Sequence, residues 1–439
     1  MNKPNNYLII ILIFVFFLIT NCSFFKDEKE EVTRTNTNYF VETVAKPDPS
    51  LKGIKVSLRK PVINKTWLQS TNNEAHKVEH PLVGNKIQLD WKVDIGKGQD
   101  KDRPLSSQPV IDEKYIYTID TTAKVSSIDK NNGKKIWNIT LKKKIKEKGI
   151  LNGGLAVNKD FLVVTTGYGN VFVINKNNGK IIWDKNIQSP IRAAPVISAN
   201  IAFFLTKDNR LYAHNLSAGD LLWTHSGLEE ISTFLGSSVP VVSKGIIIVT
   251  YSSGEVYALN VINGNVIWNM NLSLYTQSAS MENISDIRAN PIVHNDTVYV
   301  ISYNGKMISI DLNTGKRNWE SNIGGVQTPW VVSNFIYVLS KDNELICLTT
   351  DQGKIVWVSK LIDSLNVENQ DNIINWTGPL LAGRMLIVSG SHGIIASISP
   401  YSGKFLGAIN LKNSIDVSAI VSDKTVFFLT VKGDLLAYR

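Results

Sequence analysis

Cysteine is scarce in this sequence: the 439 residues contain only Cys22 and Cys347. Two cysteines that far apart exclude a cysteine-rich zinc site, a disulfide framework and a vicinal Cys-Cys bridge. Long apolar runs are missing as well, because the unbroken run Leu8–Ile19 has 12 residues and a membrane-spanning helix needs about 20. Charged residues make up 19% and hydrophobic residues 43%. This balance excludes a mainly disordered chain.

The excess of positive charge carries little functional information. Lys and Arg outnumber Asp and Glu by 47 to 38, which gives a net charge of +9. The sequence is also crowded with Asn, Lys and Ile, a bias that an AT-rich genome produces by itself. We therefore expect no nucleic-acid partner, all the more so for an exported chain.

The N-terminus has the pattern of an export signal. A basic residue, Lys3, precedes the apolar run Leu8–Ile19, which has the length of a signal-peptide core. The residues around Cys22 resemble a bacterial lipobox, although Asn21 stands where Gly, Ala or Ser is usual. Ser23 replaces the Asp that retains enteric lipoproteins at the inner membrane. We expect a signal peptide over residues 1–21 and lipidation of Cys22 at the outer membrane; an ordinary secretory signal is the alternative.

Residues 22–60 have the composition of a tether. They are charge-rich and polar without a hydrophobic period, and the prolines at Pro47 and Pro49 exclude a helix or central strand. We expect a lipidated flexible tether over 22–60 and a short pre-propeller segment over 61–84. Cys347 lies in a strand-like run and is expected to be an inert core residue.

The rest of the chain is one repeat used many times. A Gly-x-x-x-Trp pattern occurs six times, 38 to 51 residues apart, and ends at Trp137, Trp183, Trp223, Trp268, Trp319 and Trp357. A seventh copy, Ser402–Gly407, has Gly in place of Trp, and Trp91 occupies a strand without the preceding turn. Repeats of this length indicate a solenoid or a propeller.

Each repeat contains four short strands. The third is preceded by a tight turn whose key residue is Gly or Asn in every copy except one, where it is Ala123. Gly and Asn tolerate the positive φ that such turns require. Because no useful helical period follows residue 85, four short antiparallel strands every 40–50 residues predict an all-β propeller.

The strand count predicts eight blades over residues 85–439. Seven copies carry four strands, and only three strands follow the seventh. An open ring would leave unpaired sheet edges, so we expect the strand around Trp91 to pair with the C-terminal strands and close it. One Trp per blade at one position predicts a structural, inter-blade role for Trp91, Trp137, Trp183, Trp223, Trp268, Trp319 and Trp357.

These repeats resemble the quinoprotein-type propeller family, and within it the BamB-like lipoproteins of the outer-membrane β-barrel assembly machinery. The most specific matches are Trp67-x-Gln69 with His76, which is similar to the alphaproteobacterial branch, and the segments Tyr251–Leu259 and Ile284–Pro291. The resemblance covers residues 62–439.

The resemblance implies a non-catalytic scaffold without cofactor or metal. It would be anchored to the outer membrane, face the periplasm, and dock on the periplasmic domains of the barrel insertase as one subunit of a hetero-complex. The family docks through two rim loops, here Leu228–Val239 and Ser280–Asn290. The implied contact residues are Phe234, Leu235, Asp286, Ile287 and Arg288, of which Leu235 and Arg288 depart from the enteric pattern.

Two enzyme hypotheses compete with the scaffold. A quinoprotein dehydrogenase would need a vicinal disulfide, which this chain cannot form, and a calcium site for which the repeats offer no acidic cluster. His76-x-x-Glu79-His80 matches a zinc-peptidase pattern that works only on a helix. Pro81 directly follows the pattern and disfavours a long helix there. A propeller that binds a carbohydrate or another envelope ligand remains the third alternative.

Overall fold

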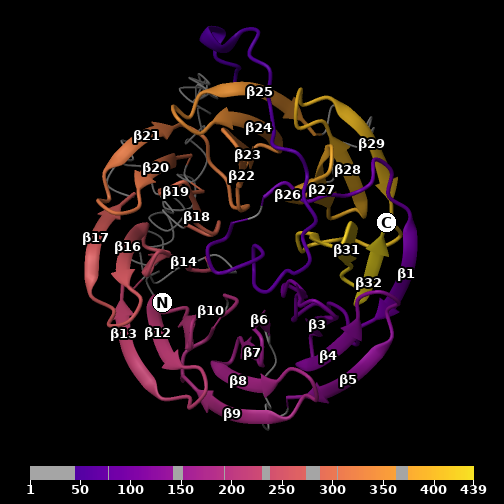
Figure 1. Cartoon of the computed structure of the whole chain (residues 1–439), viewed down its shortest axis with the longest axis vertical. Helices are drawn as coiled ribbons and strands as arrows, with labels where there is room; N and C mark the ends of the chain where they lie inside the picture. The colour runs from indigo at the N-terminus through magenta and orange to yellow at the C-terminus, as the bar shows by residue number, and fades with distance from the viewer. Residues whose placement is uncertain are drawn as a thin grey trace, which may run out of the picture. The chain divides into compact units, whose positions relative to one another are not determined.

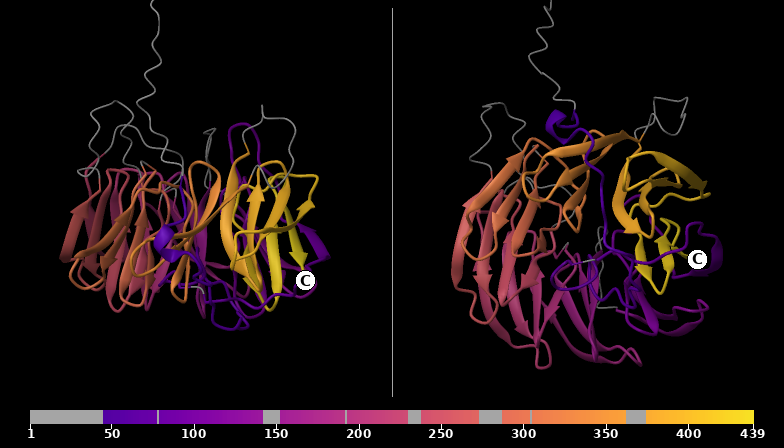
Figure 2. Two further views of the ribbon diagram at one scale, coloured as in Figure 1. Left: turned by 90° about the horizontal axis from the view of Figure 1, so that it is seen from above. Right: turned by 45° about the horizontal axis from the view of Figure 1, so that its top comes forward.

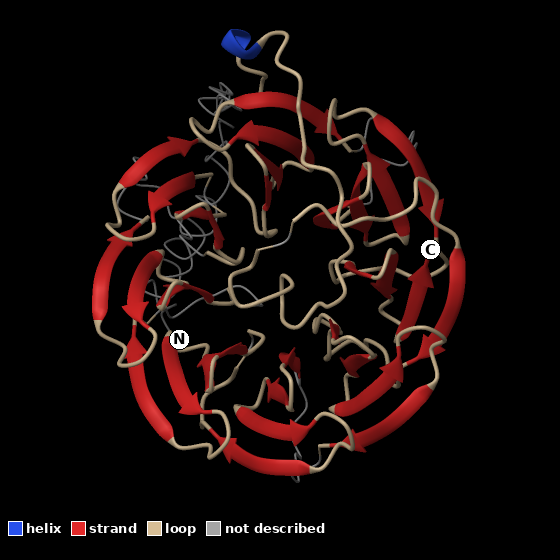
Figure 3. Cartoon of the chain, in the orientation of Figure 1, coloured by secondary structure: helices blue, strands red, loops and turns tan. Residues whose placement is uncertain are grey.

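Residues 45–439 form a ring of eight four-stranded antiparallel sheets (Figure 1). The computed structural model describes residues 45–77, 79–141, 152–191, 193–229, 238–272, 287–303, 305–361 and 374–439. Strands account for nearly all regular structure in these ranges, and the short 3-10 helix η1 (Pro49–Leu51) is the exception (Figure 3). The predicted all-β, eight-bladed propeller is confirmed. No helix in the described ranges is long and apolar enough to cross a bilayer.

Each blade is a meander that begins at the centre of the ring and ends at its outside (Figure 1). Blades one to four contain β2 (Val110–Ile111), β3 (Tyr115–Ile119), β4 (Lys124–Asp129), β5 (Lys135–Thr140); β6 (Asn152–Val157), β7 (Phe161–Thr166), β8 (Asn170–Asn175), β9 (Ile181–Asn186); β10 (Val196–Ser198), β11 (Ile201–Leu205), β12 (Arg210–Asn215), β13 (Leu221–Ser226); and β14 (Val241–Ser243), β15 (Ile246–Thr250), β16 (Glu255–Asn260), β17 (Val266–Asn271). Blades five to eight contain β18 (Ile292–His294), β19 (Thr297–Ile301), β20 (Met307–Asp311), β21 (Arg317–Ser321); β22 (Trp330–Val332), β23 (Phe335–Leu339), β24 (Glu344–Thr349), β25 (Ile355–Lys360); β26 (Trp376–Ala382), β27 (Met385–Gly390), β28 (Ile394–Ile398), β29 (Phe405–Asn410); and β30 (Ile420–Ser422), β31 (Thr425–Leu429), β32 (Asp434–Tyr438) with β1 (Leu89–Asp94).

The eighth blade joins the two ends of the propeller sequence. Strand β1 pairs antiparallel with β32, the last strand of the chain, with Trp91 opposite Ala437 and Asp94 opposite Asp434. Gln88 and Arg439 extend the ladder by exchanging two backbone hydrogen bonds. The predicted closure is therefore confirmed, and it removes the open edges that an incomplete ring would leave.

The repeat tryptophans link each blade to the next. The indole N–H of each of the six Gly-x-x-x-Trp residues donates to a backbone carbonyl of the following blade, at Lys176, Leu216, Val261, Leu312, Thr350 and Pro400 respectively. Each ring also lies against the turn glycine of that blade: a Cβ on Gly179 would come within 2.8 Å of Trp137, and Gly133 is covered in the same way by Trp91. The Gly and the Trp of the pattern thus serve neighbouring interfaces.

This arrangement explains why the seventh repeat has no tryptophan. A tryptophan ring at this position would have to cover the glycine turn that leads into the outermost strand of blade eight. That strand is β1, which comes from the N-terminus, so no such turn exists there. Gly407 stands at the tryptophan position, and a Cβ built on it meets nothing within 4 Å.

The predicted turn chemistry is present in every blade. The residues that precede the third strands have positive φ: Gly169, Asn209, Gly254, Gly305, Asn343, Gly393 and Gly433. Ala123 has φ 60° as well, so the fold imposes a left-handed conformation on a residue that disfavours it. Cys347, expected in the core, is buried in β24, where burial raises the pKa of its thiol far above the usual value.

Residues 45–84, which we call the strap, cross one end of the ring and bond to all eight blades. They reach blades one to four at Ile111, Val157, Ile197 and Val242, and blades five to eight at Pro291, Ser333, Gly383 and Asp423. Residues 45–60 were expected to belong to the tether. They instead lie against blade six, where the Asp48 N–H donates to the Ile355 carbonyl.

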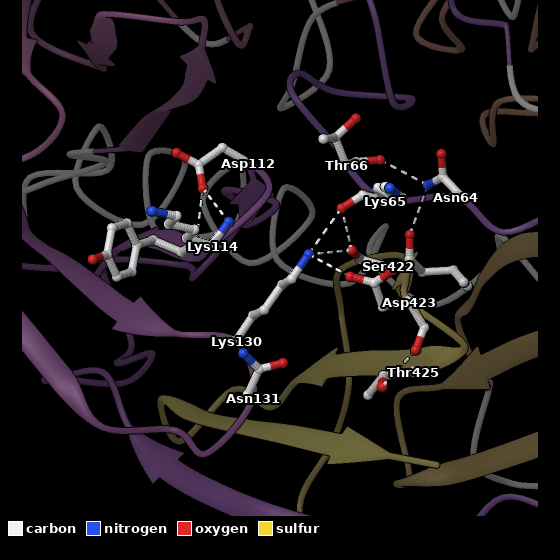
Figure 4. Close-up of polar contacts among 12 residues, drawn as sticks. Asn64, Lys65, Thr66, Asp112, Lys114, Lys130, Asn131, Ser422, Asp423 and Thr425 are labelled. Carbon is white, nitrogen blue, oxygen red and sulfur yellow. Dashed lines mark hydrogen bonds and ion pairs between the residues drawn. The ribbon is translucent and has the colours of Figure 1, made fainter.

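A buried lysine fastens the strap where the ring closes (Figure 4). The Lys130 ammonium of blade one lies 2.5 Å from the Asp423 carboxylate of blade eight and 3.1 Å from the Lys65 carbonyl oxygen of the strap. Ser422 donates to the same carbonyl at 2.6 Å, and the Asn64 amide donates to the Val421 carbonyl at 2.8 Å. The first blade, the last blade and the strap therefore share one polar cluster.

The strap also accounts for the histidines of the zinc-peptidase pattern. The His76 ring donates to the Pro291 carbonyl at 2.8 Å, while the His80 ring lies between the carbonyls of Arg59 and Gly383. Glu79 is exposed, 3.9 Å from the Lys77 ammonium. The two rings serve different blades, and no group of three potential metal ligands occurs in the described ranges.

His76 should make the protein sensitive to acid. Burial lowers the pKa of its imidazole from 6.5 to about 4, so the unfolded chain binds a proton at a higher pH than the folded chain does. Its contribution to stability is complete above pH 6.5 and should be lost as the pH falls towards 4, by about 2–3 kcal/mol. Denaturant unfolding at pH 7 and 4.5 measures this. His76→Gln should lose less stability between the two pH values than the wild type, and an equal loss would contradict the assignment.

Candidate docking surface

The described bases of the two loops expected to bind a partner, residues 228–229, 238–239 and 287–290, lie where one blade connects to the next. In most blades the strap bonds at or near the end of the innermost strand, where a hairpin leads outward, whereas the described connections from one blade to the next run at the other end (Figure 2). The bond of His76 to Pro291, which precedes β18, is an exception. The first loop connects β13 to β14 and the second connects β17 to β18, so they flank blade four. We call this end the loop rim.

The structure describes the bases of both loops. Phe234, Leu235 and Asp286 lie outside the described residues, so their contacts stay a prediction. Ile287 has 1% of its surface exposed and packs in the core between blades four and five. In the free protein it anchors the second loop and does not offer its side chain to a partner. Arg288, the next residue, is half-buried.

Asn290 ties the two loop bases together. Its side-chain oxygen accepts from the Val239 N–H at 2.8 Å, at the end of the first loop. Its amide donates to the Thr71 hydroxyl of the strap at 3.0 Å, and its backbone N–H donates to the Thr328 hydroxyl of blade six at 3.2 Å. Asn290 therefore fixes the spacing of the two loop bases and links both of them to the strap.

A second polar network supports the start of the first loop. The carboxylate of Glu255, which is buried, accepts from the Leu228 N–H at 2.6 Å, from the Ser253 hydroxyl at 2.8 Å and from the Tyr257 hydroxyl at 3.1 Å. Burial, together with the Glu255 charge, raises the pKa of Tyr257. Because a buried carboxylate needs such donors, the network holds the loop at the point where it leaves β13.

Aromatic side chains pack around this network. The Tyr251 hydroxyl and the His225 ring nitrogen lie 2.7 Å apart, and the His225 and Tyr257 rings pack at 4.5 Å. Burial lowers the pKa of His225, which keeps the ring neutral at pH 7. The segment Tyr251–Leu259, which carried part of the family resemblance, is thus the support of the first loop.

Sequence reasoning did not single out the residues that make these connections. Asn290 and Glu255 both fall within the segments that carry the resemblance, and that was their only signal. Thr71 and Thr328 gave none, because a hydroxyl that meets an amide from another blade follows no repeat. Only the fold brings residues separated by more than 200 positions, Thr71 and Asn290, within hydrogen-bond distance.

The centre of the ring contains a cavity of about 200 Å³, and strap residues form part of its lining. Trp67 and Trp330 line it, with ring centroids 6.5 Å apart, and so do amide and hydroxyl side chains such as Gln108 and Thr377. Among the lining residues that the structure describes, Asp416 is the only charged one. Pyrroloquinoline quinone is a tricarboxylate, which requires cationic partners. The described lining offers no such partner and does not fit that cofactor.

Solved structures of other proteins share the propeller fold. A structure of BamB from Moraxella catarrhalis superposes with a TM-score of 0.64 at 16% identity, covering 81% of this chain and 98% of that one. The quinohemoprotein alcohol dehydrogenase of Comamonas testosteroni superposes with a TM-score of 0.65 at 11% identity, covering 86% of this chain and 81% of that one. Identities this low establish the fold alone.

The sequence comparisons distinguish between these neighbours. The outer membrane protein assembly factor BamB of Yersinia pestis is 26% identical over 357 residues, which cover 79% of this chain and 87% of that protein. A family model described as outer membrane protein assembly factor BamB matches residues 121–359, more than half of the chain. This chain therefore belongs to the BamB family of outer membrane protein assembly factors.

Proposed function

We propose that this chain is a non-catalytic scaffold of the machinery that assembles β-barrel proteins in the outer membrane. It docks on the periplasmic domains of the barrel insertase through the loops 228–239 and 280–290. The observation that carries the proposal is the join of the two loop bases by Asn290, in a chain of the BamB family. Loops from adjacent interfaces that are held at one spacing can act as a single docking surface.

A scaffold of this kind works by holding its loops still. Binding with a pre-ordered surface avoids part of the entropy cost of association. A flat rim offers few deep pockets, so the affinity should depend on a few residues. Phe234 is the proposed apolar anchor and Asp286 the proposed charged contact, with Leu235 and Arg288 beside them and Ile287 as the buried base.

The same proposal assigns the protein to the periplasmic face of the outer membrane. Lipidation of Cys22 would hold it there, as one copy within a hetero-complex. The cavity chemistry argues against the dehydrogenase alternative, because the lining residues that the structure describes offer a tricarboxylate cofactor no cation.

Affinity capture from gently solubilised membranes tests this function. The tagged lipoprotein should retain the barrel insertase and other subunits of the assembly machinery. Capture of a different envelope component in place of the insertase would contradict the proposal and favour a ligand for the central cavity.

Asn290 should matter for docking without touching the partner. Asn290→Ala removes the bonds to Val239 and Thr71, so the loops must be ordered during binding, and we expect about a tenfold weaker affinity for the insertase. Thr71→Val is the matched control, because it removes the shorter of the two bonds from this amide to the strap, leaves the 3.5 Å bond to the Ser70 hydroxyl, and keeps the bond between the loop bases. Titration of the purified periplasmic domains measures both variants, and equal affinities for Asn290→Ala and the wild type would refute the positioning role.

A further inference from the structure

A strip of basic residues runs along the first part of the strap. Its members share an exposed side chain, and they are Lys46, Lys52, Lys55, Arg59, Lys60 and Lys65. Within residues 45–66 the only acidic residue is Asp48, which lies 3.8 Å from Lys354 of blade six. None of the six side chains has an ion-pair partner among the residues that the structure describes.

The strip stands out from the basic composition of the chain. Residues 45–66 contain six basic residues and one acidic residue, so the remaining sequence contains 41 and 37 (47 minus 6, and 38 minus 1). In the part of the chain that the structure describes, no separate stretch of this length contains as many basic residues with so few acidic ones; the basic run Lys142–Lys148 lies outside the described residues. The concentration of charge in this segment therefore needs a separate explanation.

The strip is held against the ring, so it presents its charges from a fixed position. The Asp48 N–H donates to the Ile355 carbonyl at 2.8 Å, and the Arg59 N–H donates to the Ser333 hydroxyl at 3.2 Å. Between these two points the Val56 side chain is buried. Two large apolar side chains beside the cations face outward, Ile54 at 48% and Ile63 at 51% exposure.

We propose that this strip binds the anionic headgroups of a lipid bilayer and turns the strap end of the ring towards the membrane. Exposed cations with interspersed aliphatic side chains are the combination that an anionic membrane surface attracts. The loop rim, at the opposite end of the ring, then points away from the bilayer. The inference does not depend on the partner of that rim.

The length of chain before the strap makes such a device useful. Residues 22–44 precede the first described residue, and a chain of that length can span at most about 80 Å. A lipid on Cys22 would keep the protein near the bilayer without choosing which end of the ring faces it. The strip supplies that choice through charge.

Vesicle co-sedimentation tests the proposal with the mature chain carrying Cys22→Ala, so that no covalent lipid contributes. The wild-type strip should bind vesicles of phosphatidylcholine with 30% phosphatidylglycerol, and should not bind pure phosphatidylcholine. Because exposed charges are screened by salt, raising NaCl from 50 to 500 mM should release the protein. Lys52→Glu, Lys55→Glu, Arg59→Glu and Lys60→Glu together should weaken binding about a hundredfold or more.

The matched control reverses four lysines at the loop rim: Lys207→Glu, Lys341→Glu, Lys412→Glu and Lys432→Glu. It changes the net charge by the same amount and should retain most of the binding. Thermal melting shows whether both variants fold. The salt titration is made on the chain with the unaltered strip, so it tests the proposal even where a variant fails to fold. Salt-independent binding, equal binding to neutral vesicles, or an equal loss in the control would overturn the proposal.

Discussion

A chain that lacks residues 85–96 is expected to aggregate, or to melt far below the full-length protein. The deletion removes β1, which supplies the outermost strand of blade eight. Strand β32 then becomes an unpaired edge, which is a template for association with other chains. The interface between blades eight and one also loses Trp91, whose ring covers Gly133 and packs 5.8 Å from Phe427.

Two variants separate the strand from its tryptophan. Trp91→Ala keeps the backbone ladder and removes only the ring, at a cost of about 3–5 kcal/mol. The deletion should be worse, because it breaks the ring as well. Size-exclusion chromatography and thermal unfolding compare the two. A monomeric deletion variant that melts within a few degrees of the wild type would show that β1 does not close the propeller.

Reversing the charge at Asp286 while truncating Phe234 should abolish capture of the insertase. Binding energy at protein interfaces is concentrated in a few residues, each worth about 2 kcal/mol or more. The combination Asp286→Arg with Phe234→Ala should therefore weaken the affinity more than about a hundredfold. Neither position belongs to a strand that the structure describes, so we expect the melting temperature to stay close to that of the wild type.

The strap end of the ring offers a matched control. Asp351→Arg with Ile262→Ala makes the same two chemical changes at exposed turn positions between the third and fourth strands of blades six and four. This pair should leave capture unchanged. Wild-type yield from the Asp286 and Phe234 variant, or equal losses in both pairs, would contradict the assignment of the docking surface.

The propeller could be predicted because its determinants repeat. A glycine turn followed by a tryptophan four positions later indicates one outer strand, and six copies indicate six blades. The missing fourth strand of the last blade then points to the strand around Trp91. Even the exceptions have physical reasons, since Gly407 has no following turn to cover and Ala123 adopts the turn conformation at a cost.

The strap could not be predicted in the same way. Its contacts go to different blades through different residue types, such as Leu68 to Val157 or Asn64 to Asp423, so no period appears in the sequence. Its prolines and lysines resemble those of a flexible tether, and only the ring to which they bond orders them. The same holds for Asn290, because a side chain that joins two loops is defined by the positions of both.

Site-specific photo-crosslinking tests the central claim most directly. A photoreactive amino acid replaces Glu229 or Arg288 on the loop rim in one set of cells, and Lys134 or Lys404 at the strap end in another. The account predicts crosslinks to the insertase from the two rim positions and none from the strap end. Crosslinks to the insertase from Lys134 or Lys404, with none from Glu229 or Arg288, would contradict it.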